Sequence, residues 1–98
     1  MKKHAFPALE QALAGYLHQD FLIDYANAEE AINAFVSSEP PALVDSARRE
    51  IGRFIQVVRD SPTPSEELLD LGCYYDPLGD GMGVVAWLEG VERVLSSR

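Results

Sequence analysis

The sequence is poor in the residues that build covalent or metal-bound frameworks. It has one cysteine, Cys73, and two histidines in 98 residues. A single cysteine cannot form an internal disulfide or a cysteine-based metal site. No apolar run is long enough to span a bilayer, and Glu10 and Gln11 interrupt the N-terminal stretch before it could serve as a signal peptide. We therefore expect a single cytoplasmic domain of residues 1–98 that folds without a disulfide or a metal.

Basic residues are missing from two long stretches of the chain. Sixteen acids face eight bases, which gives a net charge of −8. Residues 4–47 contain seven acids and no Lys or Arg, and residues 60–92 contain eight acids and again no base. Such a surface repels nucleic acid and anionic lipid and attracts a basic protein. The alternative is that the acidity only keeps a small protein soluble.

Strand periodicity is also absent, since no segment alternates apolar and polar residues for long enough. We therefore predict an all-α domain of about five helices. Pro7 is expected to begin the first helix, and Asn27, with Glu30 three residues later, to cap the second. The third is the clearest, because apolar residues keep one face from Leu43 to Val58.

Two further helices complete the predicted frame. Thr63 and Glu66 form a capping pair before a short leucine-rich helix that ends at Gly72. The last helix is predicted over residues 84–96. Residues 21–23 are the least regular part of the frame, and the sequence leaves open a short extended piece there as an alternative to helix.

Two clusters of aromatic and acidic residues fit neither periodicity, and together they hold all four tyrosines. The first covers residues 16–25 and the second residues 73–77. In the first cluster, Asp20 and Asp24 are expected to be exposed. Its apolar side chains are expected to anchor the first helix to the second through the core, namely Tyr16, Leu17, Phe21 and Ile23. In the second, Tyr74 and Tyr75 are adjacent outside a helix, so one should face inward and the other outward. The outward one would be a good binding anchor.

The first cluster could be imagined as a metal site or an acid/base pair made by His18, Asp20 and Asp24. No His-x-x-x-His or Glu-x-x-His pattern supplies further ligands, so neither catalytic nor metal-binding residues are predicted. His18 is instead expected to fix the junction after the first helix by a hydrogen bond, or to contact a partner.

The second cluster offers no cofactor or nucleophile site either. Residues 76–81 superficially resemble a calcium loop, but Leu78 and Trp87 occupy positions where an EF-hand needs oxygen ligands. The segment is better interpreted as a turn-rich connection. Cys73 lacks a sequence signature that links it to a histidine, so a structural thiol is predicted.

Taken together, these segments resemble one family, the small helical CdiI-type immunity proteins of bacterial contact-dependent growth inhibition. The resemblance runs from about Leu9 to Val94. Leu17 and Phe21 depart from the family pattern, which usually has an aromatic residue and a tryptophan at these two places. The resemblance is carried by the sequences YLHQDF at residues 16–21, DY at 24–25, EEAI at 29–32, CYYDP at 73–77 and WL at 87–88.

The resemblance implies an all-α cytoplasmic protein that binds the toxic domain of a partner effector, often a nuclease, and blocks it without catalysis. A nuclease has a basic cleft, and an acidic inhibitor can occupy it in place of the phosphate backbone. We expect a monomer when free, with no cofactor, nucleic acid or membrane partner. The residues expected to contact the toxin are Asp20, Asp24, Glu29, Tyr75, Asp76 and Asp80.

Two other functions remain open from the sequence. One is an acidic adaptor or DNA mimic that binds another basic host protein. The other is a small hydrolase or metal enzyme centred on His18, Asp20 and Asp24. Within the leading hypothesis, the sequence leaves open whether the inhibitor covers the active site of the toxin or a neighbouring exosite.

Overall fold

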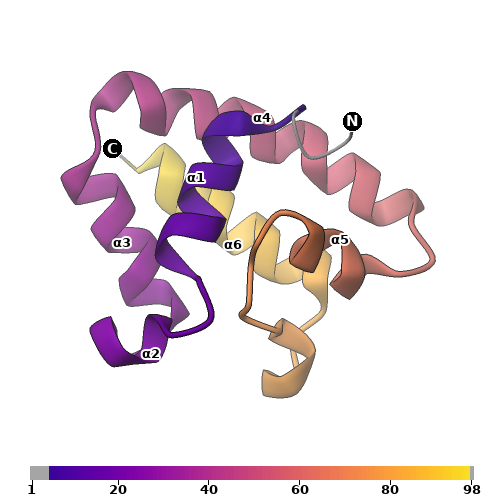
Figure 1. Ribbon diagram of the computed structural model, residues 1–98. Helices are drawn as coiled ribbons and strands as arrows, with labels where there is room; N and C mark the ends of the chain where they lie inside the picture. Colours follow the sequence, from indigo (N-terminus) through magenta and orange to yellow (C-terminus); the bar gives the residue numbers. More distant parts are fainter. Residues whose placement is uncertain (1–4, 98) are drawn as a thin grey trace.

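The protein is all-α, as predicted (Figure 1). The computed structural model describes residues 5–97, and no strand occurs in that range. Five helices have seven or more residues, which matches the predicted number; one further helical turn and a 3-10 helix complete the frame. Their bounds are α1 Pro7–Tyr16, α2 Phe21–Asp24, α3 Ala28–Ser38, α4 Pro41–Asp60, α5 Pro64–Asp70, η2 Pro77–Asp80 and α6 Val84–Ser96.

The long helix α4 organises the core. It packs against α1 and α6, and α3 also contacts both of these helices (Figure 1). The apolar stripe of α4 is buried as its periodicity predicted. Fully buried side chains from all four helices meet in one cluster, among them Leu9, Leu13, Ile32, Phe35, Ile51, Leu88 and Leu95.

The predicted helix ends are partly confirmed. The Asn27 side chain accepts a hydrogen bond from the Glu30 backbone N–H at 2.9 Å, as expected for an N-cap. Thr63 occupies the N-cap position of α5, but its side chain makes no capping hydrogen bond, so that prediction was wrong. Ser61 takes over this corner: its hydroxyl accepts from the Thr63 N–H and donates to a Glu67 carboxylate oxygen, both at 3.0 Å.

A buried carboxylate from α4 caps the start of α1. Phe6 stands at the N-cap of α1 and supplies no side-chain acceptor. Instead, Glu50 Oε1 accepts hydrogen bonds from the backbone N–H groups of Ala8 and Leu9, each at 2.9 Å. A negative charge here also interacts favourably with the positive end of the helix dipole. Glu50 therefore joins α1 to α4 across about forty residues of chain, and its burial has a structural reason.

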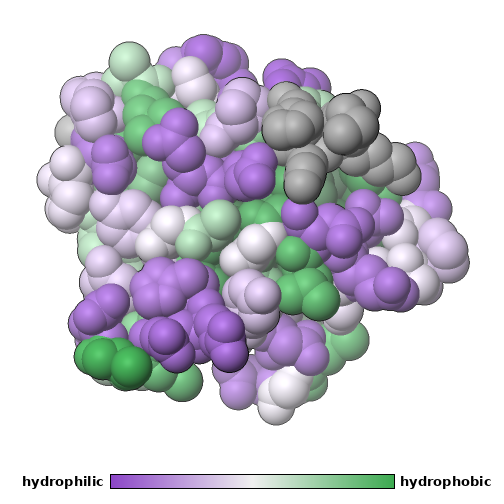
Figure 2. All heavy atoms as spheres, viewed as in Figure 1, coloured by the Kyte–Doolittle hydropathy of each residue, from purple (hydrophilic) through white to green (hydrophobic). Residues whose placement is uncertain are grey.

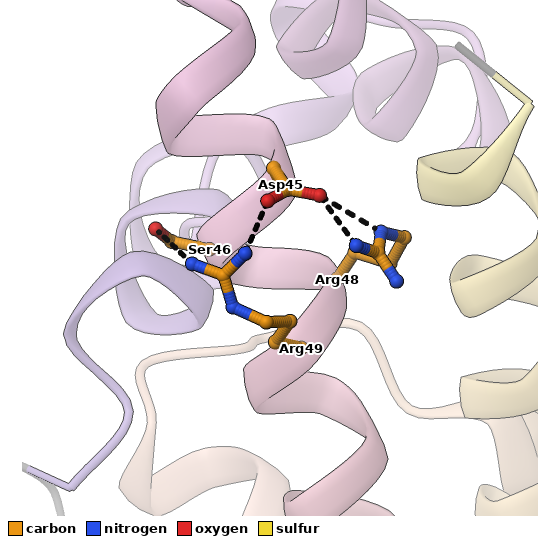
Figure 3. Close-up of polar contacts among 4 residues, drawn as sticks. All are labelled: Asp45, Ser46, Arg48 and Arg49. Carbon is orange, nitrogen blue, oxygen red and sulfur yellow. Dashed lines mark hydrogen bonds and ion pairs between the residues drawn. The ribbon is translucent and has the colours of Figure 1, made fainter.

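Three of the four arginines of α4 form ion pairs with carboxylates. Asp45 forms ion pairs with Arg48 and Arg49 one turn further on, and Arg49 also donates to the Ser46 hydroxyl (Figure 3). The hydrogen bond from Arg48, together with both nearby guanidinium charges, lowers the pKa of Asp45. At the far end of the helix, Arg59 pairs with Glu89 of α6.

Candidate partner-binding site

The two aromatic and acidic clusters lie side by side and are joined through the backbone. The Tyr74 N–H donates to the Leu17 carbonyl at 2.8 Å. Just before it, Gly72 adopts a left-handed conformation with φ +83° and passes close to Ala14 at the end of α1. A Cβ at Gly72 would come within 2.6 Å of the Ala14 Cβ, so only glycine fits this crossing.

Within the first cluster, residues 21–24 form a helical turn, α2, and the alternative of a short extended piece at residues 21–23 is excluded. Phe21 points inward and is buried, together with Leu17. Ile23 is 81% exposed and Leu22 65% exposed, so the prediction that Ile23 anchors the core was wrong. In the turn, Ile23 lies on the solvent side and Phe21 on the core side.

His18 fixes this turn by contacts with two aspartates. Its Nδ1 accepts a hydrogen bond from the Asp20 backbone N–H at 3.1 Å, and its Nε2 lies 3.7 Å from Asp24 Oδ2. The predicted role of His18 at the junction after the first helix is thereby confirmed. The carboxylates of Asp20 and Asp24 remain exposed, as predicted.

Tyr16 and Tyr25 form the base of the first cluster. Their rings are stacked with centroids 6.2 Å apart, and the Tyr16 ring also meets Phe35 edge to face. The Tyr16 hydroxyl donates to Glu39 at 2.7 Å. This hydrogen bond to a carboxylate, and to a smaller extent burial of the ring, raises the pKa of Tyr16 to about 12.

Tyr75 is the aromatic link between the second cluster and the helices. Its ring meets Phe21 edge to face at 6.2 Å and lies 5.1 Å from the Trp87 ring, centroid to centroid. Its hydroxyl donates to Asp80 at 2.6 Å. Burial of the ring, followed by this hydrogen bond, raises the pKa of Tyr75 to about 12. Tyr74 is the outward neighbour and is 55% exposed.

Cys73 and Asp76 hold the second cluster in shape. The Cys73 thiol is buried and lies 3.5 Å from the Tyr75 carbonyl, to which it donates. Burial raises the pKa of this thiol to about 12, which suits the structural role predicted for it. Asp76 accepts from the Leu78 N–H at 3.1 Å and so caps η2. The segment is a turn, as predicted, and not a calcium loop.

An open groove of about 970 Å³ lies between the two clusters. Its walls come from α2, the start of α3, the segment around η2, and α6. Four of the six predicted contact residues line it: Glu29, Tyr75, Asp76 and Asp80. Asp20 and Asp24 do not line it. Asp20 is the N-cap and Asp24 the last residue of α2, whose Phe21 and Leu22 do line the groove.

Several groove residues were missed by the sequence reasoning. Leu22, Tyr74 and Met82 line the groove with largely exposed apolar side chains, and Arg93 adds a single base. Figure 2 shows a strongly hydrophobic group of atoms at the lower left edge, where Figure 1 places α2, on a face that mixes hydrophilic and hydrophobic atoms. Leu22 and Tyr74 belong to the clusters that the sequence singled out. Met82 and Arg93 gave no such signal.

Metal-ligand clusters and membrane-spanning helices are both absent from the described residues. Within residues 5–97, no three His, Cys, Asp or Glu side chains are grouped so as to hold a metal ion, around His18 or elsewhere. In the same part of the chain, no helix combines the length and the hydropathy needed to cross a membrane.

These features define an acidic, all-helical domain with an open groove between two aromatic and acidic clusters. A family model described as CdiI immunity protein matches residues 5–95, nearly the whole chain. The chain therefore belongs to the CdiI immunity protein family, which confirms the resemblance noted in the sequence. Membership implies that it neutralises a cognate toxin of contact-dependent growth inhibition. Comparison with curated proteins gave no match, and comparison with solved structures gave none.

Proposed function

We propose that the protein neutralises its toxin by binding it directly in the cytoplasm, without catalysis, through the groove and its acidic rim. The strongest support is that two segments far apart in sequence, residues 21–32 and 74–94, line one groove. Four of the six residues expected to contact the toxin line that groove, and the other two are the N-cap and the last residue of α2, which contributes to its wall.

The charge around the groove supports a basic partner. The carboxylates of Glu29, Asp76 and Asp80 are on exposed residues, and Arg93 is the one base among the lining residues. Arg48, Arg49 and Arg59 lie elsewhere, on α4, and are paired with acids. An acidic face of this kind steers a basic partner into contact and raises the association rate at low salt.

A nuclease toxin fits this surface. Nucleases that hold RNA or DNA present Lys and Arg side chains to the phosphate backbone, and an acidic protein surface can pair with the same side chains. An acidic adaptor for another basic host protein would use the same charges. The two are separated by a pull-down from a lysate that lacks the toxin gene, in which an adaptor would still capture its partner.

The test measures association with the C-terminal domain of the effector encoded immediately upstream. Charge reversal of Asp20 together with Asp24 should lower the association rate constant by about tenfold at low salt and flatten its salt dependence. Glu29→Lys with Asp76→Lys should act in the same direction. Asp24 contacts His18 and Asp76 caps η2, so each pair should also lose some stability, about 1 kcal/mol for the Asp76 cap. Thermal unfolding measures this loss separately, and association is compared at a temperature at which every variant is folded.

A matched control changes the same charge elsewhere. Asp60 and Asp70 are exposed and end α4 and α5, where a base is compatible with the helix dipole. Asp60→Lys with Asp70→Lys should lower association less than the groove variants do. Equal losses from both sets would mean that only the net charge matters and that the groove is not the interface.

A further inference from the structure

Exposed apolar side chains gather around the groove to an unusual degree. The described residues include six large hydrophobic side chains that are exposed. Leu69 on α5 is away from the groove. The other five belong to the segments that bound it: Leu22, Ile23, Tyr74, Leu78 and Met82. Three of them, Leu22, Tyr74 and Met82, line the groove itself, and exposed apolar surface rimmed by polar groups is typical of sites of protein association.

Leu22 and Ile23 belong to the helical turn α2, Leu78 belongs to η2, and Tyr74 and Met82 lie in the segments that flank η2. Contacts with the core fix both turns. Phe21 of α2 is buried against the Tyr75 ring, and the two contacts of His18 hold the turn from outside. On the η2 side, Asp76 caps the turn and Asp80 accepts from Tyr75. A surface ordered in this way loses little conformational entropy when it binds.

The size of the groove sets the size of what it can hold. A helix about 11 Å wide occupies roughly 500 Å³ for each turn of about 5.4 Å. The groove, at about 970 Å³, therefore has room for about two turns or an equivalent length of loop. That is the scale of peptide segments that lie in grooves with a few apolar anchors.

Resting on the proposed function, we infer that the groove receives a projecting segment of the toxin domain that has apolar side chains at its centre and Lys or Arg at its flanks. The apolar centre contacts Leu22, Tyr74 and Met82 in the groove. The flanking bases pair with carboxylates of the rim. Affinity then comes mainly from the apolar contacts, and the speed of association from the charges.

Charge complementarity selects this occupant over others. The rim is acidic, which opposes a nucleic acid or an anionic lipid surface. A second copy of the same chain would place like charges against each other at this face. A basic segment with an apolar centre satisfies both the carboxylates and the exposed aliphatic side chains.

The test compares the rates at which the same toxin domain dissociates from alanine variants inside and outside the groove. Leu22→Ala and Met82→Ala each remove an exposed groove side chain, and Leu69→Ala removes one that is 52% exposed on α5. We expect the double groove variant to dissociate at least about 30-fold faster, with an unchanged salt dependence of association. Leu69→Ala should dissociate like the unmodified protein. Unchanged dissociation of the groove variant would overturn the inference.

Hydrogen exchange of the toxin domain tests the chemistry of the occupant. In the complex, protection should appear in one projecting segment that carries both apolar and basic residues. Protection spread over a flat surface or confined to a cleft would contradict the inference, although the toxin would still be bound. Absence of any binding by the unmodified protein would contradict the proposed function itself, so the two failures are distinct.

Discussion

The backbone N–H of Tyr74 donates to the carbonyl of Leu17 at 2.8 Å. This bond joins the turn after α1 to the segment after α5, so the two clusters behave as parts of one surface. The exposed side chain of Tyr74 and the neighbouring α2 turn are thereby held at a fixed separation. Disturbing the support of one cluster should consequently disturb the other.

Gly72→Ala tests that support. The substitution forces a left-handed conformation on alanine and places a Cβ against Ala14, so the free energy of unfolding should fall by about 2–3 kcal/mol. Gly79→Ala is the control, because no atom lies within 4 Å of its added Cβ and its φ is not positive. Urea unfolding gives both values, and equal values would contradict the close crossing at Gly72.

Glu50→Ala should be among the more destabilising single substitutions in the chain. It leaves the N–H groups of Ala8 and Leu9 without their buried acceptor and removes a charge that stabilises the start of α1, at a cost of about 2–4 kcal/mol. Glu50→Gln keeps an amide oxygen and should cost less. Urea unfolding at neutral pH ranks the variants, and a loss below about 1 kcal/mol for alanine would contradict the capping role.

Stability should fall as the pH rises from about 10 to about 12. Tyr16 and Tyr75 keep their protons in the folded chain up to about pH 12, whereas an unfolded tyrosine loses its proton near pH 10. In that window the unfolded state binds fewer protons, so stability decreases, while below pH 10 the contribution is complete. Unfolding in urea at stepped pH should show a weaker decrease for Tyr16→Phe with Tyr75→Phe. An unaltered slope would contradict the assignment.

Cys73 should resist alkylation until the chain unfolds. The thiol is buried, and burial raises its pKa to about 12, so the folded protein holds almost no thiolate at pH 8. Iodoacetamide at pH 8 should modify the unfolded chain in urea readily and the native chain only at the rate of opening. Mass spectrometry measures the rate of modification. Equal rates for the native and the unfolded chain would contradict a structural thiol.

The helical frame could be predicted from the sequence because its signals are local. The apolar stripe of α4, the Asn27 cap and the limits of α6 all follow from residues within one or two turns. Glu50 was missed, although it lies three residues after Ala47 and four before Phe54, within the buried stripe. Its partners are backbone groups about forty residues away, which no local pattern reveals.

The site was less predictable than the frame. The acidic residues and the clusters drew attention to segments that line the groove, but the orientation of Ile23 depends on whether residues 21–24 form a turn. Which adjacent tyrosine faces outward depends on the position of Trp87. Met82 joins the groove only because η2 and α6 meet there. These are tertiary relationships, and short sequence patterns carry little information about them.

The groove is assembled from both halves of the chain, and this has a consequence during synthesis. α2 leaves the ribosome about sixty residues before α6 begins, which at typical rates of elongation is roughly 3–12 s. Throughout that interval a nascent chain carries one wall of the groove without the opposite wall. Under the binding mode proposed above, a new molecule becomes competent to bind its toxin only when α6 has docked.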